Sequence, residues 1–202
     1  MDDDIMELKK SLYGFSGLSE EDFLFGEPFW YRRTIKKGDF FNTQGIVCKE
    51  LGYITKGLFR LYRYDDGAEE ERNLNFFSEN QFLSSFPSFV AQYPCSYFIE
   101  ALEDSEYLAI KHEHLQQLYE RSNTWNSFGR KLAEGNIIRS QIRIDSLLFL
   151  NHEQQYVQLL EEHPTIAERV PLYHISSYLG IKNPSLSRIR KRIREKKAVP
   201  PL

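Results

Sequence analysis

Two short helical patterns joined by a glycine, at residues 172–193, constrain this chain more than any other segment. The first pattern is apolar on one face, and Gly180 follows it; helices commonly end at a residue that can adopt a positive φ. Asn183 and Pro184 then predict a second helix, as its N-cap and its first helical residue. The predicted core of the pair is apolar and consists of Ile175, Leu179, Ile181, Leu186 and Ile189.

The second helix combines an apolar stripe with a strongly basic remainder. Leu186, Ile189 and Ile193 share one face at the spacing of a buried stripe. Serines and cations occupy the other faces: Ser185, Ser187, Arg188, Arg190, Lys191, Arg192 and Arg194. Two short helices, a tight turn and a basic second helix are typical of a helix-turn-helix, whose second helix enters the DNA major groove. The alternative is an ordinary pair of packed helices with a solvated basic face.

The distribution of charge along the chain favours nucleic-acid binding by its C-terminal part. From Thr165 onward there are 9 Lys and Arg against 2 Asp and Glu, whereas residues 1–164 hold 17 basic and 27 acidic side chains. A cationic end on an acidic body is what binding to a phosphate backbone requires.

Composition excludes several classes of protein. Hydrophobic residues make up 41% and charged residues 27%, as in soluble globular proteins. No apolar run approaches the roughly 20 residues that span a membrane. The acidic start, MDDDIMELKK, lacks the layout of a signal peptide, and two cysteines, Cys48 and Cys95, are too few for a disulfide framework. We expect a cytoplasmic protein of bacterial type.

Residues 30–110 have the pattern of antiparallel β structure. Glycines separate segments rich in aromatic and β-branched residues, which indicates a sandwich or barrel of short strands. A hairpin turn is predicted at 65–67, and a second strand pair at 96–101 and 107–110. Residues 82–95 are predicted as a short helix with a loop, either a binding element or an apolar plug.

A long helix without proline is predicted from Trp125 to about Leu150. Its apolar stripe is wider than one contact needs, which favours packing against both its own domain and a partner. Since most soluble oligomers are symmetric homodimers, a helix pair about a two-fold axis is expected; burial within one domain is the alternative. The residues expected in the dimer helix are Ile137, Ile138, Ile142, Ile144 and Leu148.

The order of barrel, long helix and helix-turn-helix resembles the Crp/Fnr family of bacterial transcription regulators, and among them the Bacteroidetes type. The resemblance covers essentially the whole chain and is carried by FFSENQF, FIEALEDSEYLAI, YVQLLEEHPTIAERVP and YHISSYLGIKNPSLSRIRKRI. It implies an α+β fold with an N-terminal double-stranded β-helix (β-roll), a long central dimerisation helix and a C-terminal winged-helix-like helix-turn-helix domain. The implied domains are 1–124 for the cyclic-nucleotide-binding-like effector domain, 125–151 for the dimerisation helix and 152–202 for DNA binding.

The ligand pocket of the family is degenerate in this sequence. Members that bind cyclic AMP carry a Gly-Glu pair for the ribose and an Arg-Ser or Arg-Thr pair for the phosphate, which needs a fixed cation. The residues at the matching positions are Phe82, Leu83, Ser84, Ser85, Cys95 and Ser96, with no Arg or Lys between Glu79 and Ile110. Binding of a cyclic nucleotide in the family's manner is therefore not expected, and the pocket is either empty or takes another, less charged ligand whose identity the sequence does not give.

Other chemistries lack support in the sequence. An iron–sulfur cluster takes four cysteine ligands as a rule, and two are present. His112 and His114 have no third metal ligand nearby in sequence, so they are interpreted as surface histidines. We find no nucleophile elbow, no Gly-rich phosphate loop and no paired carboxylates with a clear acid/base arrangement. We expect no enzyme activity, no metal and no cofactor.

The resemblance carries the DNA contacts over residue by residue. The base-reading positions fall on Asn183, Pro184 and Arg188, and the arginine fork can pair with guanine O6 and N7. Pro184 departs from the acidic or polar residue expected there, so the operator of the best-studied members is not assumed. The predicted phosphate contacts are Lys182, Ser185, Ser187, Lys191 and Arg192.

These observations predict a homodimeric regulator that reads a palindromic operator on double-stranded DNA, with effector control from the β-roll. RNA polymerase and a small effector are further partners that the resemblance implies. The alternative is a β-roll ligand sensor that acts through a protein partner, with the basic helices as a docking surface. The salt dependence of DNA binding separates the two.

Overall fold

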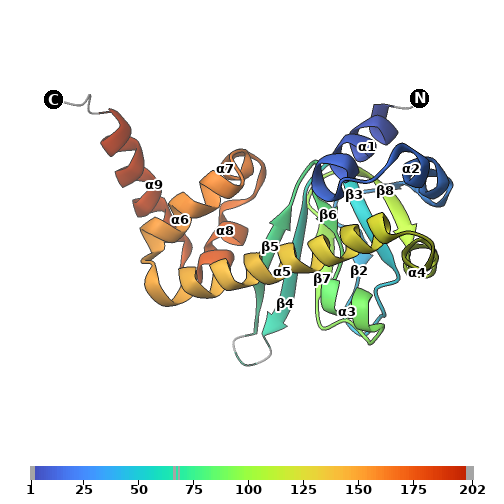
Figure 1. Ribbon diagram of the computed structural model, residues 1–202. Helices are drawn as coiled ribbons and strands as arrows, with labels where there is room; N and C mark the ends of the chain where they lie inside the picture. The colour runs from blue at the N-terminus through green and yellow to red at the C-terminus, as the bar shows by residue number, and fades with distance from the viewer. Residues whose placement is uncertain (1–2, 66, 68, 199–202) are drawn as a thin grey trace. The chain divides into compact units, whose positions relative to one another are not determined.

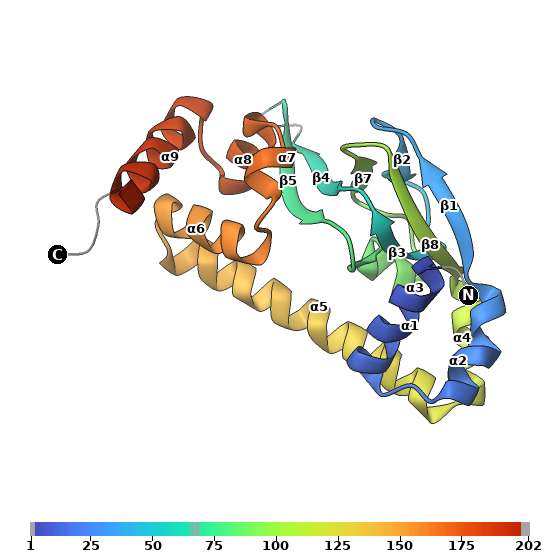
Figure 2. The same cartoon turned by 90° about the horizontal axis from the view of Figure 1, so that it is seen from above.

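The computed structural model describes residues 3–65, 67 and 69–198, drawn in Figures 1 and 2. These described residues form two compact units, 3–62 with 75–141 and 63–65, 67 and 69–74 with 142–198. In chain order the elements are α1 Asp3–Ser16, α2 Glu20–Gly26, the 3-10 turn Glu27–Phe29, β1 Tyr31–Ile35, β2 Phe40–Asn42, β3 Glu50–Lys56, β4 Phe59–Asp65, β5 Glu70–Phe77, β6 Phe82–Leu83, α3 Phe86–Ala91, β7 Phe98–Ala101, β8 Ser105–Lys111, α4 His112–Arg121, α5 Asn123–Phe149, α6 His152–Glu162, α7 Ile166–Arg169, α8 Leu172–Leu179 and α9 Asn183–Ala198.

The predicted β domain is confirmed as two four-stranded antiparallel sheets. One has the order β1-β8-β3-β6 and the other β2-β7-β4-β5. The segment at 82–95 folds as predicted, with the short helix α3 inside it. The predicted hairpin at 65–67 joins β4 to β5, which lie side by side, although Asp66 falls outside the described residues.

The predicted pairing of 96–101 with 107–110 is wrong. β7 pairs with β2 and β4, whereas β8 pairs with β1 and β3, so the two strands belong to different sheets. The backbone hydrogen bonds explain the crossing: Leu102 N–H still donates to the carbonyl of Leu58, next to β4, at 2.8 Å. Asp104 then accepts from Lys37 N–H at 3.0 Å in the turn to the other sheet.

Helices close one end of the barrel unit, where α1, α2 and α4 gather around the first part of α5 (Figures 1 and 2). Ser19 is the N-cap of α2, and its hydroxyl accepts from Asp22 N–H. The buried residues that join α1, α4 and α5 are Leu8, Leu12, Leu115, Leu118, Trp125, Phe128 and Leu132. A second cluster lies between the sheets and contains Ile54, Phe59, Leu83, Ile99, Ala101, Tyr107 and Ala109.

The second unit contains the C-terminal helices and the tip of the β4–β5 hairpin, residues 63–74. Its buried apolar residues come from the segment that runs from α6 to α9 and are Tyr156, Leu159, Ile166, Val170, Ile175, Tyr178, Leu179, Leu186 and Ile189. α9 continues to Ala198, so among the described residues no strand follows the second helix of the predicted motif. The described residues thus show the helix-turn-helix without the wing.

Candidate nucleic-acid interface

A tight glycine turn joins α8 to α9, as the sequence predicts. Gly180 has a φ of 68°, a left-handed conformation that suits glycine. Its N–H bonds to the carbonyls of Ser176 and Ser177, and Ile181 N–H donates to the carbonyl of Ser176 at 3.0 Å. These bonds satisfy the last carbonyls of α8, as in other helices that end on a left-handed residue.

The second helix begins one residue earlier than predicted. Asn183 is its first helical residue, not its N-cap. The carbonyl of Lys182 accepts from Ser185 N–H at 2.9 Å and from Leu186 N–H at 3.3 Å, which makes Lys182 the capping position. Pro184 still lies in the first turn, where its missing N–H has no helical partner to lose.

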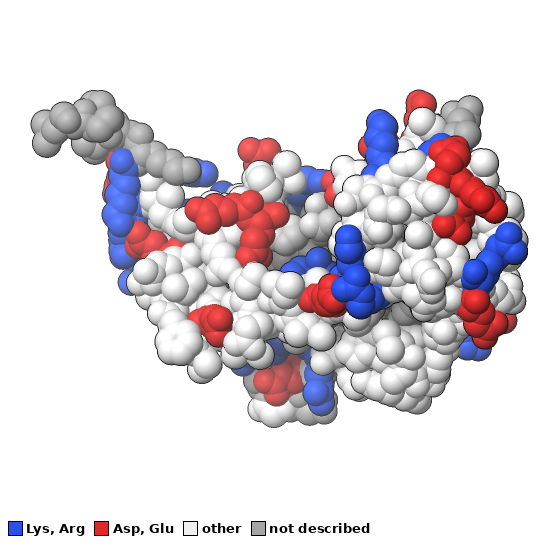
Figure 3. Space-filling view, viewed as in Figure 1, with Lys and Arg blue, Asp and Glu red and all other residues white. Residues whose placement is uncertain are grey.

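The cationic faces of α9 point away from the core. Leu186 and Ile189 are buried, while Ile181 is half-buried. Of the eight predicted DNA contacts Ser185 is half-buried, and seven are exposed: Lys182, Asn183, Pro184, Ser187, Arg188, Lys191 and Arg192. Figure 3 shows the resulting line of Lys and Arg over α9, with carboxylates over α6. Their roles in binding DNA stay predictions.

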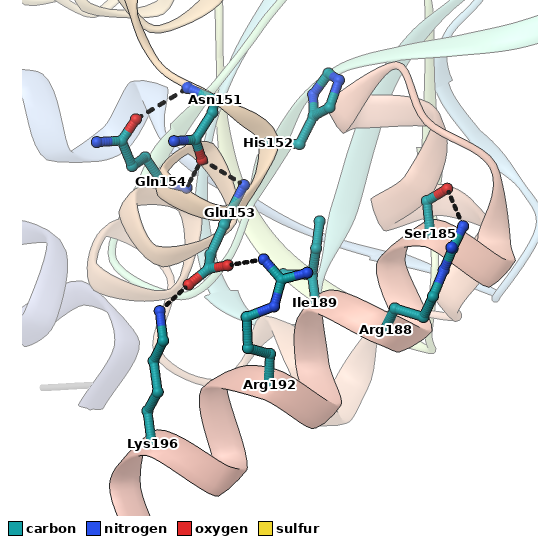
Figure 4. Close-up of a pocket in the computed structure, with 9 residues that line it drawn as sticks. All are labelled: Asn151, His152, Glu153, Gln154, Ser185, Arg188, Ile189, Arg192 and Lys196. Carbon is teal, nitrogen blue, oxygen red and sulfur yellow. Dashed lines mark hydrogen bonds and ion pairs between the residues drawn. The ribbon is translucent and has the colours of Figure 1, made fainter.

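A cavity of about 660 Å³ lies between the start of α6 and the outer face of α9 (Figure 4). Its lining contains three predicted DNA contacts, Ser185, Arg188 and Arg192. The remaining lining residues are Asn151, His152, Glu153, Gln154, Ile189 and Lys196. α6 begins with a capping box, in which Asn151 accepts from the N–H groups of Glu153 and Gln154, and Gln154 accepts from Asn151 N–H.

Two cations of α9 are paired with one carboxylate of α6. Glu153 accepts from Arg192 Nη1 at 2.7 Å and from Lys196 Nζ at 2.7 Å. Lys196, followed by Arg192, lowers the pKa of Glu153, which therefore stays ionised at neutral pH. Sequence reasoning missed Glu153, because it precedes Arg192 by 39 residues and belongs to another helix.

The side chain of Arg188 bonds to residues of its own helix and not to Glu153. Its Nε donates to the carbonyl of Pro184 and its Nη2 to the hydroxyl of Ser185, each at 3.4 Å, the long end of the hydrogen-bond range. In Figure 4 its guanidinium stands beside Ser185, apart from Glu153. The predicted base contact is thus not part of the ion pairs that hold Arg192 and Lys196.

The tip of the β4–β5 hairpin is hydrogen-bonded to α8. Ser177 Oγ accepts from Asn73 N–H at 3.0 Å and donates to the carbonyl of Glu71 at 2.5 Å. Asn73 Nδ2 also donates to the carbonyl of His174 at 3.3 Å, and both side chains are buried. One serine of the helix-turn-helix therefore bonds two main-chain groups of β5.

We expect Ser177→Ala to lower the free energy of unfolding by about 1–3 kcal/mol, because a part-buried N–H would lose its acceptor. Urea denaturation followed by circular dichroism measures the change. Ser187→Ala, at an exposed position on α9, is the control and should stay within about 0.5 kcal/mol of the parent protein. Equal stabilities of the two variants would contradict the role given to Ser177.

The predicted dimer residues are exposed along α5. Ile137, Ile138, Ile142, Ile144 and Leu148 have between 43% and 69% of their surface exposed, in contrast to Trp125 and Phe128 of the same helix. Leu147 and Phe149 are exposed as well. An apolar groove of about 540 Å³ between α5 and α6 includes Ile142, Phe149 and Val157. Exposed apolar surface of this kind marks interaction sites in soluble proteins.

The residues of the predicted ligand pocket are largely bonded to one another or buried in the barrel. Cys95 Sγ donates to Ser85 Oγ at 2.8 Å, Leu83 belongs to the core between the sheets, and Ser96 is exposed. Ser84 is buried, and Phe82 packs against Phe128 with ring centroids 5.2 Å apart. Burial raises the pKa of the nearby Cys48 thiol to about 11, so this thiol stays protonated at neutral pH.

The sequence analysis did not identify a buried cation of the β domain. Arg60 of β4 is 4% exposed, and its Nε and Nη2 both donate to Oε2 of Glu100 on β7, at 2.9 and 2.5 Å. Its guanidinium also lies 3.8 Å from the ring centre of Tyr62. Because Arg60 precedes Glu100 by 40 residues, no local pattern predicts the pair. The carboxylate already neutralises this arginine, so a phosphate would have to displace it.

The two histidines after β8 contact aromatic rings. His114 lies 4.9 Å from Phe29 and His112 lies 5.2 Å from Phe89, between ring centroids. Within residues 3–65, 67 and 69–198 no group of three or more His, Cys, Asp or Glu is placed to hold a metal ion. No helix in that same set is long and apolar enough to cross a membrane.

We compared the sequence and the structure with those of known proteins. Residues 32–122 match the family model of the cyclic nucleotide-binding domain, and no curated protein matches the sequence. FixK2 of Bradyrhizobium japonicum is similar in structure, with a TM-score of 0.71 and 12% identity over 83% of this chain and 86% of that chain. A regulator assigned to the crp/fnr family from Eubacterium rectale has a TM-score of 0.68 and 16% identity, over 92% and 88%.

A kinase subunit is similar in structure over a smaller part of this chain. The regulatory subunit of a cAMP-independent protein kinase A from Trypanosoma cruzi, bound to guanosine, has a TM-score of 0.50 and 12% identity, over 65% of this chain and 50% of that chain. At these identities the likeness shows the fold. FixK2 and the crp/fnr-family regulator share that fold over most of their length, and the kinase subunit shares it over half of its own.

Proposed function

We propose that this chain, in which a cyclic nucleotide-binding domain precedes a helix-turn-helix, is a DNA-binding transcription regulator of the Crp/Fnr type. The observation that carries the proposal is α9: a basic helix whose predicted DNA contacts face away from its core. Because the same fold hosts unrelated functions, the exposed cations of α9, and not the fold, support DNA binding. The protein acts in the cytoplasm and has no enzyme activity. RNA polymerase is a further partner.

Base reading is assigned to the start of α9 and phosphate binding to its flanks. Asn183, Pro184 and Arg188 face base edges in the major groove. Lys182, Ser185, Ser187, Lys191 and Arg192 contact phosphates and fix the register. The protein acts as a homodimer through the exposed apolar residues of α5, and so reads a palindrome with half-sites about 10 bp apart.

The barrel senses an effector of low charge. The hydrogen bond between Cys95 and Ser85 and the pairing of Arg60 with Glu100 disfavour a cyclic phosphate. The structurally similar regulatory subunit from Trypanosoma cruzi is bound to guanosine, a nucleoside that carries no phosphate, which supports the proposal of an uncharged ligand. The Bacteroidetes type stays a prediction.

The salt dependence of binding to random-sequence duplex DNA tests the proposal. Three predicted phosphate cations per protomer give six per dimer, so log K should fall against log salt with a slope of about −5. Fluorescence anisotropy of a labelled duplex measures it. The second candidate function, a sensor acting through a protein partner, is favoured if no DNA is retained at low salt.

A further inference from the structure

The carboxylate of Glu153 on α6 accepts hydrogen bonds from two cations of α9, Arg192 and Lys196. Arg192 and Lys196 are one helical turn apart on the same face, and both point at Glu153 in Figure 4. The side chain of Glu153 is 20% exposed, whereas Arg192 and Lys196 are 59% and 66% exposed. Both cations thus keep more than half of their side-chain surface in contact with solvent while they are paired with Glu153.

The backbone on each side of Glu153 is fixed. Asn151 Oδ1 accepts from Glu153 N–H at 3.0 Å, and Gln154 Oε1 accepts from Asn151 N–H at 3.0 Å. Glu153 lies in the first turn of α6. The partial positive charge of a helix N-terminus also favours the ionised form of its carboxylate. One charge of −1 faces two charges of +1, and the three groups together carry +1.

A phosphate oxygen and a carboxylate oxygen make the same kind of charge-assisted bond to these donors. Arg188 is outside the arrangement, since its hydrogen bonds go to Pro184 and Ser185. Glu153 thus acts on the part of DNA binding that depends on charge alone, and not on the predicted base contact.

We propose, on the basis of the DNA-binding function above, that Glu153 is an internal counter-ion that competes with DNA phosphates for Arg192 and Lys196. It weakens sequence-independent binding, so that retention on an operator depends more on the contact made by Arg188. DNA binding releases the two cations from Glu153 and transfers them to the phosphate backbone.

The test compares Glu153→Gln with Glu161→Gln on random-sequence duplex DNA. Both variants remove one negative charge from α6, but Glu161 lies in the groove between α5 and α6. We expect Glu153→Gln to bind about three- to tenfold more tightly than Glu161→Gln at low salt, with a salt slope steeper by about 1 to 2. Thermal melting of both variants checks that the helices stay folded.

A second pair of variants tests which cations are involved. Arg192→Gln should weaken DNA binding more in the Glu153→Gln background than in the parent protein, because only there is Arg192 fully available to phosphate. Equal affinity of Glu153→Gln and Glu161→Gln, or weaker binding by Glu153→Gln, would overturn the proposal and make Glu153 a brace for α9. Failure of every variant to bind at low salt would instead reject the DNA-binding function itself.

Discussion

A protein carrying Ile144→Glu and Leu148→Glu is expected to elute as a monomer and to lose at least about 100-fold in operator affinity. Both side chains are exposed on α5, on one face of the helix. In a dimer through α5 the new carboxylates would be buried without partners, which opposes association. Separating the protomers removes the gain from binding two linked half-sites, which is about 10²–10⁴-fold.

Analytical ultracentrifugation and DNA-binding titrations measure the two effects. The matched control is Gln116→Glu with Gln117→Glu, which adds the same two charges to the exposed face of α4. This control should stay dimeric and lose little affinity. If the protein with the α5 substitutions is still a dimer, the exposed apolar residues of α5 contact another partner. The two-fold axis of the dimer would then lie elsewhere.

Arg188→Ala is expected to abolish sequence preference at one base pair in each half-site, at about 1–3 kcal/mol per half-site. The guanidinium is exposed near the start of α9 and its two hydrogen bonds are long, so little opposes its reorientation toward guanine. Titration of the operator and of operators changed at single base pairs reports the loss.

Lys191→Ala is the matched comparison, since it removes one exposed charge from the same helix. As a phosphate contact, Lys191 should weaken binding to operator and random DNA equally and reduce the salt slope by about 1 per protomer. If Arg188→Ala behaves in the same way as Lys191→Ala, Arg188 contacts a phosphate and the base-reading role belongs to other residues.

The helix-turn-helix could be predicted because its signals are local. A glycine at the turn, the Asn183-Pro184 pair and an apolar stripe act within a few residues of one another. The remaining error, a helix start displaced by one residue at Asn183, is of the size at which helix ends are commonly uncertain. The long helix α5 was predictable for the same reason, through its length and the absence of proline.

Features that depend on distant residues could not be predicted. β7 and β8 follow each other closely and look like a hairpin, yet each finds its partners in a different sheet. Arg60 meets Glu100, and Ser177 meets Asn73, only after the chain has folded. The pairing of Glu153 with Arg192 and Lys196 of α9 is of this kind. Because of it, the candidate interface contains a carboxylate that is proposed to compete with DNA phosphates for these two cations.

The central claim is that a dimer of this chain reads a palindrome on DNA. The most direct test is to bind the purified protein to a library of genomic DNA fragments across a salt series and to sequence the bound fraction. We predict enrichment of one palindromic sequence, with half-sites about 10 bp apart, that strengthens as rising salt removes non-specific binding. Absence of retention at the lowest salt, or enrichment of a sequence without two-fold symmetry, would contradict the claim.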